Sequence, residues 1–157
     1  MAMRANKPPI VTIEGEKTRR AQVGQPLQLA VAVADDGVPK APGQGAPVPD
    51  PKVVARRSLM PPQRITVGKS LGLHLSWFVY RGAGKVTFDP VQVKPWEDTR
   101  AGANSPWAPL WIAPPLPSDG KWTASATFDT PGTYVLRARA DDGALFGDDE
   151  LTVTVVR

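Results

Sequence analysis

The sequence predicts an all-β fold, an antiparallel β-sandwich, from two observations. Five runs alternate apolar and polar residues, and they lie at 27–33, 73–80, 122–128, 134–139 and 151–155. Every second side chain of a strand lies on the same face, so each run presents one apolar and one largely polar face. Turn-forming pairs such as Asp36-Gly37 and Pro131-Gly132 separate the runs. Such alternation is typical of antiparallel sheets that cover a core on one side.

Two weaker strands, at 9–13 and 85–88, complete a set of about seven, the number usual for a β-sandwich. The residues predicted to face the core are Leu27, Leu29, Val31 and Val33, then Leu73, Leu75, Trp77 and Val79, then Trp122, Ala124, Ala126 and Phe128, then Tyr134, Leu136 and Ala138, and last Leu151, Val153 and Val155. Trp77, Trp122, Tyr134 and Leu136 are therefore predicted core residues. His74 and Ser76 fall on the opposite, outward face.

Two long segments fall outside these strands, at 38–68 and 89–120, and both are rich in proline and glycine. They exceed the usual length of a connection, so we expect them to be functional, packed on the sandwich or mobile. No internal repeat or second core is visible. The sequence thus predicts a single domain over 1–157, with 1–8 as a flexible N-terminal segment.

Composition narrows the functional classes. The 157 residues include 18 prolines and 14 glycines, which favours turns over long helices. The net charge of +4 is scattered along the chain, which favours a solubilising surface over nucleic-acid binding. Without cysteine there is no disulfide, thiolate metal site or cysteine nucleophile. No apolar run is long enough for a membrane span. The N-terminus lacks a signal region, and a signal peptide removed from the natural protein would explain this.

The segment 130–143, TPGTYVLRARADDG, resembles the end of an immunoglobulin-like or PKD-like domain. The resemblance implies a proline-glycine turn into strand F, with Tyr134 at the corner bonding back to the backbone. Trp77 matches the tryptophan of strand C. Leu136 stands where an antibody domain carries its second cysteine, so the chain resembles the cysteine-free bacterial relatives.

The segment 76–88 is also similar to a set of uncharacterised bacterial proteins that are expected to be secreted. This similarity implies an extracellular or cell-surface location and no particular activity. The single histidine, His74, has no second histidine with which to share a metal, and neither a nucleophile elbow nor a phosphate loop is present. We therefore expect a non-catalytic structural or interaction module of a bacterial secreted or surface protein.

Acidic turns form the first candidate site. Asp35 and Asp36 follow one predicted strand, and Asp141 and Asp142 follow another. In an immunoglobulin-like sandwich these two turns lie at the same end, and converging carboxylates suit Ca²⁺. The alternative is that all four are solvated turn aspartates, because Asp-Gly is a common turn pair.

Tryptophans in the second long segment form the other candidate site: Trp96, Trp107 and Trp111. Exposed tryptophans can stack on sugars or anchor a protein interface, which predicts carbohydrate or protein binding. The alternative is that they cover an open side of the sandwich as a small additional core. A third possibility is self-assembly into homo-oligomers through exposed edge strands.

Overall fold

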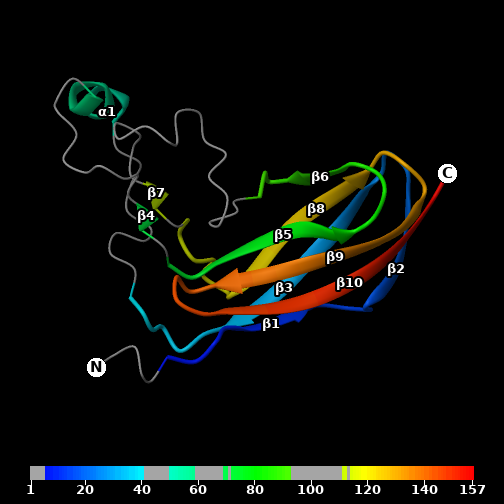
Figure 1. The fold of residues 1–157 in the computed structure, drawn as a ribbon, viewed down its shortest axis with the longest axis horizontal. Helices are drawn as coiled ribbons and strands as arrows, with labels where there is room; N and C mark the ends of the chain where they lie inside the picture. Colours follow the sequence, from blue (N-terminus) through cyan, green and yellow to red (C-terminus); the bar gives the residue numbers. More distant parts are fainter. Residues whose placement is uncertain (1–5, 41–49, 59–68, 71, 93–110, 113) are drawn as a thin grey trace.

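The computed structural model of the chain describes residues 6–40, 50–58, 69–70, 72–92, 111–112 and 114–157 (Figure 1). The strands within these residues are β1 (Ile10–Ile13), β2 (Thr18–Gln22), β3 (Pro26–Ala34), β4 (Lys69–Ser70), β5 (His74–Arg81), β6 (Val86–Asp89), β7 (Trp111–Ile112), β8 (Lys121–Phe128), β9 (Gly132–Asp141) and β10 (Phe146–Val156), and the helix is α1 (Pro51–Ser58).

Two four-stranded sheets make up the sandwich, which confirms the predicted all-β class. One sheet has the order β1-β3-β8-β6 and the other the order β2-β10-β9-β5. This is the arrangement of an immunoglobulin-like sandwich, with strands A, B, E and D in one layer and A′, G, F and C in the other. β4 and β7 form a separate two-stranded parallel ladder beyond one end of the sandwich (Figure 1).

The N-terminal strand passes from one sheet to the other. β1 pairs antiparallel with β3, from Ile10 opposite Ala34 to Ile13 opposite Val31. β2 then pairs parallel with the last strand, β10, over five residues. β2 was not predicted, because Thr18–Gln22 is a polar run that contains two arginines and lacks apolar alternation. Its pairing with β10 is decided by tertiary structure, since residue pattern alone does not favour a strand there.

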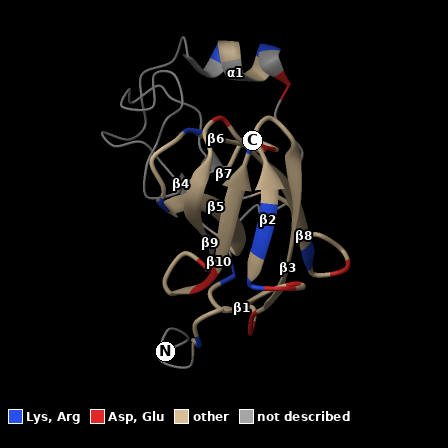
Figure 2. Cartoon of the chain, turned by 90° about the vertical axis from the view of Figure 1, so that its right-hand side faces the viewer, with Lys and Arg blue, Asp and Glu red and all other residues tan. Residues whose placement is uncertain are grey.

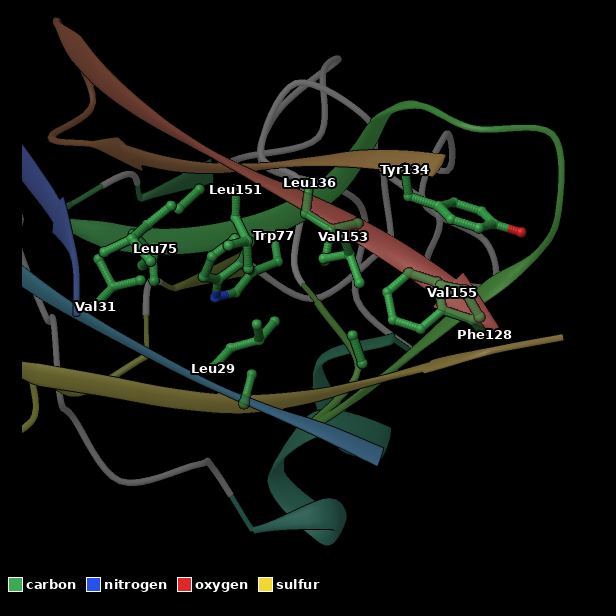
Figure 3. Close-up of a cluster of buried hydrophobic side chains, with 14 of the residues drawn as sticks. Leu29, Val31, Leu75, Trp77, Phe128, Tyr134, Leu136, Leu151, Val153 and Val155 are labelled. Carbon is green, nitrogen blue, oxygen red and sulfur yellow. The ribbon is translucent and has the colours of Figure 1, made fainter. Parts of the chain in front are cut away.

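A single apolar layer between the sheets forms the core (Figure 3). Its large buried side chains come from both sheets: Leu29 and Phe128 from one, and Trp77, Tyr134 and Leu136 from the other. Trp77 is 1% exposed and Leu136 is fully buried, whereas Trp122 is partly buried at the margin of the core. The alternating positions of β3, β8, β9 and β10 thus face inward as their sequence pattern predicts.

β5 departs from the predicted alternation. His74 is 2% exposed and Ser76 is fully buried, so the prediction that both lie on the surface is wrong. Both faces of the first half of β5 are buried, and the His74 imidazole Nδ1 lies 2.6 Å from the carbonyl oxygen of Gly72. Period-two alternation identifies which residues share a face, but it does not show whether other parts of the chain cover that face.

The two long segments contain short regular elements that their residue pattern did not predict. α1 lies within 38–68, and β7 lies within 89–120. β7 pairs with β4, which directly follows the first segment. Within the described residues, no helix is both long and apolar enough to cross a membrane.

Candidate functional site

The corner tyrosine packs and bonds as the resemblance implies. Its hydroxyl donates a hydrogen bond to the carbonyl oxygen of Thr130 at 2.7 Å. The Tyr134 ring lies 4.9 Å from the ring of Phe128, centroid to centroid, and closes one end of the core (Figure 3). Gly82 and Gly84 pass so close to Tyr134 that a Cβ on either residue would overlap its side chain. These contacts define a structural corner.

The predicted acidic turns do lie at one end of the sandwich, beyond β3 and β9. Figure 2 shows acidic residues in the turns at this end. Asp142 is 1% exposed, and its Oδ1 accepts hydrogen bonds from the backbone N–H groups of Ala144 and Leu145. Its Oδ2 accepts a hydrogen bond from the side-chain amide of Asn6 at 3.0 Å. Asp142 therefore shapes the β9–β10 turn and holds the incoming N-terminal segment.

The other three aspartates also cap backbone groups. Asp36 accepts hydrogen bonds from the N–H groups of Val38 and Lys7, one at each carboxylate oxygen. Asp35 accepts from Gly37, and Asp141 accepts from Gly143. Each of the two turns is thus stabilised by side-chain to backbone bonds two residues ahead, the usual role of aspartate in a turn.

Two oxygens at this end lack a donor among the described residues. Oδ1 of Asp35 and Oδ1 of Asn6 are both buried without a hydrogen bond. Burial is the main reason that the pKa of Asp35 is raised above its usual value, and the nearby carboxylates of Asp142 and Asp36 add to the rise. Among the described residues, no three His, Cys, Asp or Glu side chains are placed to hold a metal together. A calcium site at Asp35, Asp36, Asp141 and Asp142 stays a prediction.

Asp149 is a contrasting carboxylate, at the crossing of β1 and β10. Burial opposes its ionisation, but hydrogen bonds from the backbone of Ile13 and the ammonium group of Lys17 outweigh it, so that the pKa of Asp149 is lowered. A lowered folded-state pKa contributes stability above pH 3.8, the unfolded value, and this contribution is lost as pH falls through the folded pKa. Asp149 therefore fastens the N-terminal strand where it changes sheets.

The outer face of β5, β9 and β10 carries a ladder of arginines, aromatic rings and carboxylates that sequence reasoning did not identify. The Arg137 guanidinium lies 3.6 Å from the centroid of the Tyr80 ring, and the Arg139 guanidinium lies 4.1 Å from that of Phe146. Arg139 also forms a two-bond pair with Asp148, with both bonds at 2.7 Å. The sequence contains a signal for this ladder: Arg137 and Arg139 are alternate residues of a strand whose opposite face packs in the core.

The tryptophan site falls largely outside the described residues. Trp96 and Trp107 lie there, and Trp111 is the first residue of β7. The ladder that pairs β7 with β4 places Trp111 opposite Lys69. A role of these tryptophans in ligand binding stays a prediction.

No family model matches this chain, and no curated protein matches it. Several solved structures are similar in fold. A conjugative transposon lipoprotein from Bacteroides eggerthii has a TM-score of 0.49 at 10% identity, over 93% of this chain and 96% of that one. Domains 4 and 5 of the S-layer protein SbsC have a TM-score of 0.42 at 8% identity, and the D00-D0 domain of intimin a TM-score of 0.41 at 10% identity. This chain aligns over 95% of its length with each of these two but spans only 54% and 48% of theirs.

At such identities the likeness concerns the fold alone, and the class follows from the chain itself. Its strand order, the corner Tyr134 and the buried Trp77 of β5 define an immunoglobulin-like β-sandwich. This fold supports many unrelated functions, so the function has to be argued from the geometry of particular elements.

Proposed function

We propose that this chain is a non-catalytic, load-bearing structural module of a bacterial secreted or cell-surface protein. The observation that carries the proposal is the parallel pairing of β2 with β10, from Thr18 opposite Thr152 to Gln22 opposite Val156. The chain enters at one end of the sandwich and leaves at the other (Figure 1). The surface location is part of the proposal and is supported by the sequence resemblance to bacterial extracellular modules.

This pairing determines how tension acts on the sandwich. When the two ends are pulled apart, β2 and β10 are drawn in opposite directions along their length. Their backbone hydrogen bonds are then loaded together in shear, and none can break before its neighbours are strained. The ladder is extended on both sides, since Thr152 N–H donates to Lys17 and Val23 N–H donates to Val156, each at 2.9 Å. The β1–β3 pair is loaded in the same sense.

Val23→Pro tests this role, because proline has no N–H to donate to Val156. With single cysteines replacing Lys7 and Arg157 as handles, we expect Val23→Pro to lower the unfolding force of the protein. Forced unfolding depends on the unfolding rate, so single-molecule force spectroscopy is the direct measurement. Leu27→Ala is the control, because Leu27 is a partly buried residue of β3 outside this ladder. An equal loss of force in both variants would argue against the proposal.

A second candidate role for the same end of the module is cation binding. It is supported by the buried, donor-free oxygens of Asp35 and Asn6 beside the carboxylate of Asp142. Oxygen ligands of this kind suit Ca²⁺, and a bound cation would offset both the burial and the lesser carboxylate repulsion that raise the pKa of Asp35. Binding there would tie the N-terminal segment to the β9–β10 turn.

The test is a thermal melt of chelator-treated protein with and without calcium at about a hundred times its dissociation constant, where a bound ion stabilises the fold by about 2.7 kcal/mol. We expect the melting temperature to rise by several degrees, on the order of 2–4 °C per kcal/mol for a chain of this length. Asp35→Asn should abolish the rise, and Asp129→Asn, in the β8–β9 turn at the opposite end of the sandwich, should keep it. No rise in the unaltered protein would show that these aspartates act only as turn caps.

A further inference from the structure

The outer face of β5, β9 and β10 differs in kind from the opposite face of the sandwich. Along the central strands of the other sheet, the outward residues are uncharged except for Lys121 at the start of β8: Gln28, Ala30 and Ala32 on β3, and Thr123, Ser125 and Thr127 on β8. The β5-β9-β10 face instead exposes two aromatic side chains, with Tyr80 at 45% and Phe146 at 54% exposed. Exposed aromatic residues and arginines are enriched at protein interfaces.

The side chains of this face are held in place before any partner binds. Two guanidinium groups lie near the Tyr80 ring, that of Arg137 at 3.6 Å from the ring centroid and that of Arg81 at 5.5 Å. In a second group, the Arg139 guanidinium lies 4.1 Å from the centroid of the Phe146 ring and 5.7 Å from that of Phe78. A bulge between Val79 and Arg81 places Arg81 opposite Val135, on the outer face beside Tyr80. Such ordering lowers the entropy lost on association.

The face has two corners of opposite charge. At one corner, Arg137 is paired with Glu150, which leaves the charge of Arg81 without an ion pair among the described residues. At the other corner, Arg139 is paired with Asp148, and the carboxylate of Asp141 forms no ion pair with any residue that the structure describes. The first corner is therefore basic and carries Tyr80, and the second is acidic and carries Phe146.

The strand register gives the separation of these corners. Phe146 lies opposite Asp141, and Arg81 lies opposite Val135, six residues along β9. At about 3.4 Å per residue and about 4.8 Å between strands, the corners are roughly 20 Å apart along the sheet and about 10 Å across it. On β5 the exposed part of the patch is limited to the second half of the strand, because His74 and Ser76 are buried on the outer face. The charges of the patch are balanced, which suits a protein surface better than a polyanion or a small molecule.

We propose that this face binds the same face of a second copy of the chain. In a two-fold interface the same patch of both copies takes part, so the patch has to complement itself. A residue that contacts a second residue on the other copy is matched by the same contact in reverse. A two-fold axis through the middle of the patch exchanges its corners. It brings Arg81 of each copy to Asp141 of the other, and Tyr80 of each copy to Phe146 of the other.

The area of the patch sets the strength of this pairing. Roughly 20 Å by 10 Å is well below the area of about 800 Å² per partner that a standard stable interface buries. The pairing is therefore weak for isolated molecules and becomes effective where many copies are held close together. Such lateral contact would link neighbouring copies of a load-bearing module. It goes beyond the proposed function and does not depend on it.

Sedimentation equilibrium of the full chain tests the pairing, at protein concentrations from about 10 μM to about 1 mM, the range of weak associations. We expect the average mass to rise from monomer toward dimer with concentration. Phe146→Ser and Arg81→Glu should each weaken dimerisation about tenfold, the effect of losing one interface anchor. Higher salt should weaken it too, because the Arg81–Asp141 contacts are ionic.

Lys121→Glu is the matched control, because it makes the same charge reversal on the outer face of the other sheet. It should leave the dimerisation constant unchanged. Circular dichroism of each variant checks that the sandwich is folded. A monomer at every concentration would overturn the proposal. So would a dimer that survives both Phe146→Ser and Arg81→Glu, since that would indicate pairing through the edge strands.

Discussion

Replacing Trp77 with alanine is expected to lower the free energy of unfolding by about 3–5 kcal/mol, the range for a large aromatic side chain in a packed core. Trp77 is 1% exposed and lies between the two sheets, against Leu29 and Leu136 in the same cluster (Figure 3). Because small domains have a total stability of about 5–15 kcal/mol, this single change removes a large part of it. Urea denaturation followed by circular dichroism measures the loss.

Two further variants test whether the loss of stability in Trp77→Ala comes from lost packing in the core. Trp122→Ala removes an equally large side chain that is only partly buried, so its effect should be clearly smaller. Trp77→Phe should cost less than its lost volume suggests, because the indole Nε1 is buried without a hydrogen-bond acceptor among the described residues. Removing an unsatisfied buried donor offsets part of the packing loss. An effect of Trp77→Ala no larger than that of Trp122→Ala would contradict the position of Trp77 in the core.

Gly82→Ala is expected to destabilise the fold by about 2–4 kcal/mol, from overpacking and backbone strain together. Gly82 has a φ of 148°, which side-chain-bearing residues rarely adopt, and its Cβ would overlap the ring of Tyr134. The corner would have to open, and the hydrogen bond from Tyr134 to Thr130 would weaken. Chemical denaturation gives the change in stability, and the near-ultraviolet circular dichroism of the tyrosine reports the corner.

Gly37→Ala provides the matched comparison. Gly37 also has a positive φ, 75°, but a Cβ there has open space around it. It should therefore cost only the backbone term, about 1 kcal/mol. Equal effects of the two substitutions would show that the ring of Tyr134 does not pack on Gly82.

The sequence predicted those parts of the fold in which a strand buries one face. β3, β8, β9 and β10 alternate cleanly because only their inner residues meet the core. β2 was not predicted because it forms by pairing with the edge of β10, and its own residues have no apolar alternation. His74 was misplaced because burial of the outer face of β5 depends on parts of the chain that are distant in sequence.

In the candidate sites, too, some features follow from the local residue pattern and others depend on parts of the chain that are distant in sequence. That the turns of Asp35 and Asp142 share one end follows from the topology of the sandwich, which the turn signals and resemblance indicated. That Asn6 reaches Asp142 could not be predicted, since the two residues are 136 positions apart and the amide belongs to a segment without regular structure. The ladder of Arg137, Arg139 and Phe146 depends on cross-strand register, which the turn residues constrain but do not fix.

The most direct test of the load-bearing role compares two directions of pulling on the same fold. The natural chain contains no cysteine, so cysteine pairs can be placed at will as handles. Handles at residues 7 and 157 load β2 against β10 in shear. Handles at residues 133 and 157, which lie at the same end of the β9–β10 pair, open that pair one hydrogen bond at a time. We expect a markedly higher unfolding force in the first direction, and equal forces in both would contradict the account.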